Sequence, residues 1–144
     1  MRRFPLLVLL FAAPAAAAGD FRSIGDNAVP MYDAPSIKAN ALFVASKFYP
    51  VEVIVQVDNW NKVRDVAGDL AWVEKKNLSD TRTVLVTAEL ADVRESPEDT
   101  APLVFQARKG VALEVVELGA GPWVKVRHRG GQTGFVRANQ VWGL

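Results

Sequence analysis

The sequence predicts an all-β protein, made of two tandem small barrels that pack against each other and are preceded by a cleaved signal peptide. Three observations lead to this prediction. The N-terminus has a short apolar segment behind two arginines, the rest of the chain repeats itself, and both copies lack helical periodicity. The predicted units are residues 1–18 (signal peptide), 19–80 (first barrel) and 81–144 (second barrel).

The first 18 residues have the pattern of a secretory signal peptide. Arg2 and Arg3 precede an apolar core, residues 6–13, and small alanines follow it up to Ala18. This core is shorter than the ~20 apolar residues that a transmembrane helix needs. We therefore expect cleavage after Ala18, with an uncleaved anchor as the alternative. The expected location is the periplasm, or the medium if the protein is secreted.

The composition excludes several classes of function. The 144 residues contain no cysteine and a single histidine, His128, which excludes disulfides, Cys-ligated metals, thiol nucleophiles and multi-histidine metal sites. Without residues 1–18 the chain has 15 basic and 16 acidic residues, a balance that does not suit nucleic-acid binding. His128 begins a hairpin loop between two arginines, where we expect it to be solvated.

Catalytic motifs are also missing from the sequence. There is no phosphate-binding glycine loop, no metal-ligand spacing and no pattern typical of a nucleophile with its base. We therefore expect no enzyme activity, no cofactor and no bound metal. We also expect no nucleic-acid partner and no stable membrane insertion after cleavage of the signal peptide.

The chain after residue 18 is an internal repeat with an offset of about 63 residues. Residues 60–65, which begin with Trp60, align with residues 123–128, which begin with Trp123. Toward the N-terminus the offset decreases to 62 and then to 61, which pairs Tyr32 with Val93. Offset changes in polar or glycine-rich segments indicate loops of different length in two copies of one fold.

Both copies have the pattern of β-strands. Residues 51–57 and 111–116 are rich in β-branched side chains that partly alternate with polar ones. Turn-forming residues divide each copy into roughly five short strands. A unit of this size buries only ~60% of its unfolded surface, and closure removes free strand edges. We therefore expect a small barrel from each copy.

The connector between the copies predicts that the barrels pack together. Residues 79–83 contain neither glycine nor proline, and the apolar segment Val84-Leu85-Val86 follows at once. An apolar strand beside the connector needs a cover, and the other barrel can supply it.

Each copy resembles the bacterial SH3-like (SH3b) domain. The motifs that carry the resemblance are Trp60-Asn-Lys-Val-Arg64 and Gly68-Asp-Leu-Ala-Trp-Val73 in the first copy, with Trp123-Val-Lys-Val-Arg127 and Gly131-Gln-Thr-Gly-Phe-Val136 in the second. The resemblance covers essentially the whole chain after residue 18. It implies a non-catalytic binding module of the cell envelope, whose ligand is a cell-wall peptide or an envelope protein. Arg137 and Gln140 stand where eukaryotic SH3 domains have proline and tyrosine, so proline-rich peptides are not the expected ligand.

Strand parity predicts an outward-facing aromatic and basic strip on each barrel, independently of any family. Side chains alternate between the two faces of a strand, so Trp60, Lys62 and Arg64 share one face. Two basic side chains do not point unpaired into a small core, and this face must therefore be the outer one. A hairpin turn near Gly68 places Lys62 opposite Trp72, where a cation–π contact can form.

The same reasoning applies to the second copy, in which Lys125 lies opposite Phe135. The candidate ligand-binding residues are therefore Trp60, Lys62, Arg64, Trp72, Trp123, Lys125, Arg127 and Phe135. Aromatic residues and arginine dominate binding hot spots, which favours a ligand surface. Two other uses stay open: packing within the protein, including the joint between the barrels, and an interface with a partner chain. The alternative function is accordingly that of a structural adaptor without a small ligand.

Overall fold

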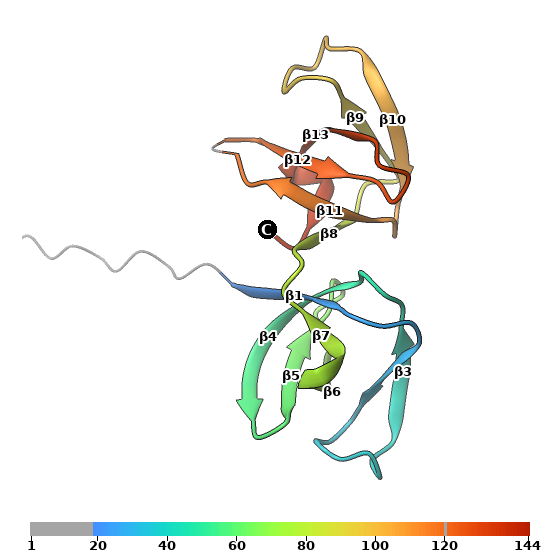
Figure 1. Ribbon diagram of the computed structural model, residues 1–144, viewed down its shortest axis with the longest axis vertical. Helices are drawn as coiled ribbons and strands as arrows, with labels where there is room; N and C mark the ends of the chain where they lie inside the picture. The colour runs from blue at the N-terminus through green and yellow to red at the C-terminus, as the bar shows by residue number, and fades with distance from the viewer. Residues whose placement is uncertain (1–18, 120) are drawn as a thin grey trace, which may run out of the picture.

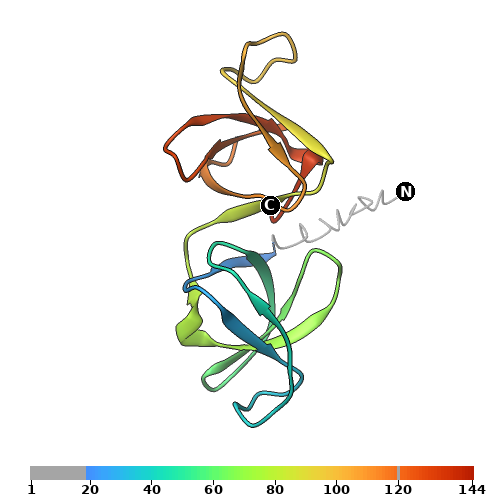
Figure 2. The same ribbon diagram turned by 90° about the vertical axis from the view of Figure 1, so that its right-hand side faces the viewer.

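The computed structural model describes residues 19–119 and 121–144, and the predicted signal peptide lies outside these residues. They form two seven-stranded antiparallel sheets, one from each copy, that lie one above the other along the long axis (Figure 1). The view turned by 90° shows each sheet curling around its own interior (Figure 2). The predicted all-β fold of two tandem barrels is confirmed. No helix in the described part of the chain is long and apolar enough to span a membrane.

Barrel 1 contains the strands β1 to β7 in the spatial order β3-β2-β6-β5-β4-β1-β7. Their bounds are β1 (Asp20–Ile24), β2 (Val29–Tyr32), β3 (Ala41–Ala45), β4 (Pro50–Val57), β5 (Trp60–Arg64), β6 (Leu70–Glu74), the 3-10 turn η1 (Lys75–Asn77) and β7 (Leu78–Ser79). The expectation of about five strands was too low. The two-residue β7 is too short to show periodicity, and it is held by its pairing with β1.

Barrel 2 repeats this order as β10-β9-β13-β12-β11-β8-β14. Its elements are β8 (Thr83–Val86), β9 (Leu90–Arg94), β10 (Leu103–Arg108), β11 (Ala112–Glu117), β12 (Trp123–Arg127), β13 (Thr133–Arg137), the 3-10 turn η2 (Ala138–Gln140) and β14 (Val141–Trp142). Each strand thus has a counterpart in barrel 1, and the final strand β14 pairs with the first strand β8.

Each barrel has its own apolar core. Ile24, Met31 and Val51 are fully buried in barrel 1, and Val93 and Leu113 in barrel 2. Burying one such side chain contributes about 1.5–3 kcal/mol. On β5 and β12 the buried positions alternate with half-buried or exposed ones, which fixes the direction in which the candidate site residues point.

The structure corrects one part of the repeat alignment. Tyr32 lies opposite Trp72, and Arg94 lies opposite the equivalent Phe135. Tyr32 therefore corresponds to Arg94, and the offset upstream stays at 62. The predicted pairing of Tyr32 with Val93 was wrong by one residue, which in a strand moves a side chain to the opposite face.

The two barrels are in contact, as predicted from the short connector. The Phe21 ring at the start of barrel 1 packs edge-to-face against Trp142 of β14, with ring centroids 5.3 Å apart. Arg82 in the connector stacks over the same Phe21 ring, 5.5 Å from its centroid. Thr83 at the start of β8 is buried, and its hydroxyl donates a 2.6 Å hydrogen bond to the carbonyl oxygen of Phe48 in barrel 1.

Candidate functional site: the aromatic surface of barrel 1

Four side chains form a continuous patch on the outer face of barrel 1. Lys62 of β5 lies directly opposite Trp72 of β6, and Tyr32 of β2 lies opposite Trp72 on its other side. The Lys62 ammonium is 5.9 Å from the Trp72 ring centroid, and the Tyr32 ring meets Trp60 edge-to-face at 5.6 Å. We call Tyr32, Trp60, Lys62 and Trp72 the aromatic surface. All four are half-buried, so each keeps an accessible part.

The predicted orientation of β5 is confirmed. Asn61 and Val63 are buried, while Trp60 and Lys62 are half-buried and Arg64 is exposed. No register shift occurs between β5 and β6. Arg64 lies at the far end of β5, where it forms a 3.4 Å ion pair with Glu52.

The equivalent region of barrel 2 is organised differently. Lys125 lies opposite Phe135 and is 5.8 Å from its ring centroid, as in barrel 1. Trp123, however, lies opposite Arg137, whose guanidinium covers the indole at 4.8 Å. Arg137 in turn binds both carboxylate oxygens of Asp99. A charged pair thus occupies the surface that remains aromatic in barrel 1.

The Asp99–Arg137 pair also changes the acid–base behaviour of both groups. Hydrogen bonding from the Arg137 guanidinium lowers the pKa of Asp99, and the same bond raises the pKa of Arg137. Both groups therefore keep their charges over the whole neutral range. Arg94 and Asp92 line the same small hollow of about 120 Å³.

The remaining predicted residue, Arg127, does not belong to a joint patch with Trp123. Arg127 is exposed at the other end of β12 and pairs with Glu114 at 3.7 Å. The structure thus brings Trp60, Lys62 and Trp72 together in barrel 1, and it places Arg64 and Arg127 in ion pairs away from the tryptophans.

Two features of this surface were not predicted from the sequence. Tyr32 completes the aromatic surface, and the correct offset of 62 would have shown that its counterpart is Arg94. The cover on Trp123 depends on Asp99, which is 38 positions away from Arg137 in the sequence. Residues 19–119 and 121–144 contain no group of three or more Asp, Glu or His side chains placed to hold a metal ion.

Two tandem antiparallel barrels, each with a strand that carries Trp, Lys and Arg on its outer face, define a duplicated β-barrel module. The sequence matches the family model of the bacterial SH3 domain twice, over residues 25–80 and 87–143. The chain therefore belongs to the bacterial SH3 domain family, as its repeated motif predicted. A comparison with curated proteins finds no match.

Several solved structures are similar to this chain. NlpC1 from Trichomonas vaginalis is 16% identical, with a TM-score of 0.40 over 94% of this chain and 50% of that one. NlpC2 from the same organism is 14% identical, with a TM-score of 0.39 over 87% of this chain and 48% of that one. An NlpC/P60 family protein from Bacillus cereus is 16% identical, with a TM-score of 0.38 over 85% of this chain and 56% of that one. This chain spans about half the length of these proteins.

Proposed function

We propose that this protein is an exported, non-catalytic binding module that recognises a cell-wall peptide through the aromatic surface of barrel 1. The observation that carries the proposal is the contiguity of Tyr32, Trp60, Lys62 and Trp72 on an outer face. Large aromatic side chains and cations are the residues on which binding energy concentrates. Membership of the bacterial SH3 domain family supports a role at the cell envelope.

The chemistry of the surface suits a peptide that carries both carboxylates and apolar groups. Trp60 and Trp72 offer apolar ring faces and an indole N–H each, while the Lys62 ammonium can pair with a carboxylate. Glu74 lies directly opposite Trp60 and forms a 3.6 Å ion pair with Lys76, so an amino group of the ligand would compete with Lys76 for this carboxylate. These groups would bind a peptide by stacking and charge pairing, with no reaction at the surface.

The contacts of the two tryptophans argue against a role in the joint between the barrels. Trp60 packs on Tyr32 and Trp123 is covered by Arg137, in each case within its own barrel. Phe21, Thr83 and Trp142 form the joint instead. The adaptor function, with an envelope protein on the same surface, remains the second outcome of the test below.

The test is co-sedimentation of the purified protein with purified cell walls. Trp60→Ala removes the indole that packs on Tyr32 in the aromatic surface, and we expect it to weaken binding about tenfold or more, since tryptophans are typical hot spots. Trp123→Ala is the matched control, and it should leave binding nearly unchanged because Arg137 already covers that indole. Thermal melting checks that both variants fold.

Two results would contradict the proposal. If Trp60→Ala folds and still sediments with cell walls like the original protein, the aromatic surface does not bind them. If the original protein does not sediment at all, cell-wall binding is excluded. Cross-linking in living cells from position 60 then shows whether an envelope protein occupies the surface, as the adaptor function requires. Cell fractionation tests the proposed export to the periplasm.

A further inference from the structure

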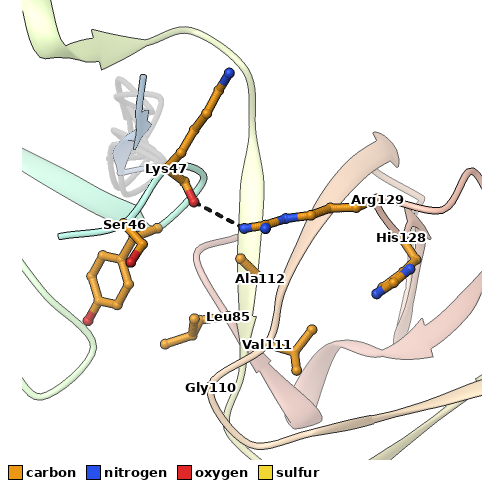
Figure 3. Close-up of a pocket in the computed structure, with 9 residues that line it drawn as sticks. Ser46, Lys47, Leu85, Gly110, Val111, Ala112, His128 and Arg129 are labelled. Carbon is orange, nitrogen blue, oxygen red and sulfur yellow. Dashed lines mark hydrogen bonds between the residues drawn. The ribbon is translucent and has the colours of Figure 1, made fainter. Parts of the chain in front are cut away.

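A cleft between the barrels contains two adjoining cavities, and a third cavity, lined by barrel 2 alone, continues from them. The first, of about 430 Å³, lies between Lys47 in the loop before β4 and the segment from Gly110 to Ala112 (Figure 3). The second, of about 340 Å³, is lined by Phe48, and the third, of about 290 Å³, extends along β10. His128 lines all three cavities. The His128 ring is half-buried and keeps an accessible part, and the hairpin after β12 folds toward barrel 1.

Three cationic residues that line the cleft have no carboxylate partner among the described residues: Lys47, Arg108 and Arg129. Elsewhere the arginines are paired, in Arg22–Asp80, Arg64–Glu52, Arg94–Asp92, Arg127–Glu114 and Arg137–Asp99, and Arg82 donates to the carbonyl oxygen of Gly143. Of the described arginines, Arg82, Arg108 and Arg129 have no carboxylate partner. Arg129 donates a 3.5 Å hydrogen bond to the carbonyl oxygen of Lys47. Arg108 and Arg129 line the cleft, as does Lys47. Glu114 also lines the second cavity, but it already pairs with Arg127, so the cleft keeps three cations without a carboxylate partner. Their concentration indicates an anionic ligand.

The Phe48 backbone is strained at the wall of the cleft. Phe48 has a φ of +74°, a left-handed conformation that costs a non-glycine residue about 1–2 kcal/mol. Its counterpart in barrel 2 is Gly110, with a φ of +88°. The Phe48 ring lies under the Arg129 guanidinium at 5.1 Å and near the Lys47 ammonium at 5.2 Å. Such strain persists at functional sites, and here it places an apolar ring beside two cations.

His128 adds a hydrogen-bond donor to the cleft. Its Nδ1 accepts a 3.2 Å hydrogen bond from the backbone N–H of Gly130, so the proton of the neutral imidazole is on Nε2. The ring packs against Phe105, with centroids 5.5 Å apart. Packing and hydrogen bond together fix the orientation of the imidazole.

From these observations we infer that the cleft between the barrels binds the free C-terminal carboxylate of a short peptide with apolar side chains. Arg108 and Arg129 present planar forks that match a carboxylate, and charge-assisted hydrogen bonds of this kind are the strong ones. Leu85 and Val111 supply apolar contacts beside them. The volumes of the two cavities between the barrels fall within the range of ligand pockets. This site lies apart from the aromatic surface and is independent of the proposed function.

The test uses acetylated trialanine as the probe, and the same peptide with a C-terminal amide as its matched control. His128 is the only histidine in the sequence, so its ring signals in proton NMR of the untagged protein report on the cleft without assignment. The free carboxylate should shift these signals on titration, and the amide should need at least tenfold more peptide for the same shift.

Variants test the role of the cleft arginines. Arg129→Gln and Arg108→Gln should each weaken trialanine binding about tenfold, while Arg64→Gln on barrel 1, outside both sites, should leave the His128 shift unchanged. Both cleft arginines are exposed, so the substitutions should not impair folding, which thermal melting checks. The inference is overturned if amide and carboxylate bind alike, if both arginine variants bind like the original protein, or if inorganic phosphate shifts His128 and trialanine does not.

Discussion

The hydroxyl of Thr83 donates its 2.6 Å hydrogen bond to the carbonyl oxygen of Phe48, and this bond joins the first strand of barrel 2 to the loop before β4 in barrel 1. The acceptor belongs to the residue whose ring forms one wall of the cleft. The joint and the cleft therefore share one strained residue, and a change in either is expected to affect the other.

Thr83→Val keeps the shape of the side chain but leaves the Phe48 carbonyl without its donor. Because Thr83 is buried, we expect the free energy of unfolding to fall by about 1–3 kcal/mol. Urea denaturation followed by fluorescence and by circular dichroism measures this loss, and separate transitions for the two barrels would show that the joint has weakened. Thr133→Val, at an exposed position on β13, is the control and should have little effect. An unchanged free energy of unfolding for Thr83→Val would mean that the bond contributes nothing.

The backbone conformation of Phe48 and Gly110 predicts a difference between glycine and alanine at both positions. A Cβ at Gly110 would meet no atom within 4 Å, so Gly110→Ala tests backbone strain alone and should destabilise the protein by about 1 kcal/mol. At position 48, Phe48→Gly should be more stable than Phe48→Ala by about the same amount. Chemical denaturation of the three variants provides the measurement. If alanine is as stable as glycine at position 48, the left-handed conformation is not retained in solution.

The buried side chain of Asn61 is a position where one substitution should stabilise the folded protein. It is buried on β5, and its Oδ1 has no hydrogen-bond partner, whereas the equivalent position of barrel 2 is the buried Val124. Removing an unpaired polar group from an apolar interior recovers its desolvation cost, so Asn61→Val should raise the free energy of unfolding by about 1–3 kcal/mol. Val124→Asn should lower it by a similar amount. A loss of stability in Asn61→Val would indicate that the amide has a partner in solution.

Because Arg137 is paired with Asp99, we expect the contact between the Arg137 guanidinium and the Trp123 ring to depend on pH. The hydrogen bond from Arg137 lowers the pKa of Asp99 in the folded protein, so the pair stabilises the fold above the unfolded value of about 3.9. That contribution is lost as the pH falls through the lowered folded pKa. The Trp123 indole signal in NMR should therefore move only in acid, and Asp99→Asn should abolish the transition. A Trp123 signal that still moves in Asp99→Asn would assign the transition to another group.

The sequence alone was sufficient to predict the arrangement within each hairpin. The identical spacing of Trp60 and Trp123 from their turns fixes Lys62 opposite Trp72 and Lys125 opposite Phe135, because register within a hairpin follows from the turn. Strand parity then placed Asn61 and Val63 inside the barrel.

Contacts between distant segments could not be predicted in this way. The Asp99–Arg137 pair, the Tyr32–Trp60 contact and the Arg129 contact with Phe48 each join residues from different parts of the fold. Nothing in the local sequence around His128 shows that its hairpin faces the other barrel. The positive φ of Phe48 could not be predicted from the sequence either, since only the corrected alignment places this residue at the position of Gly110.

The difference between Tyr32 and Arg94 at equivalent positions has an evolutionary consequence. A duplicated gene segment frees each copy from having to retain every ancestral property. One copy can keep an exposed aromatic face while the other copy acquires charged residues at the same positions. The duplication also creates an interface between the two copies, and a cleft at this interface is a surface that a single ancestral domain did not have.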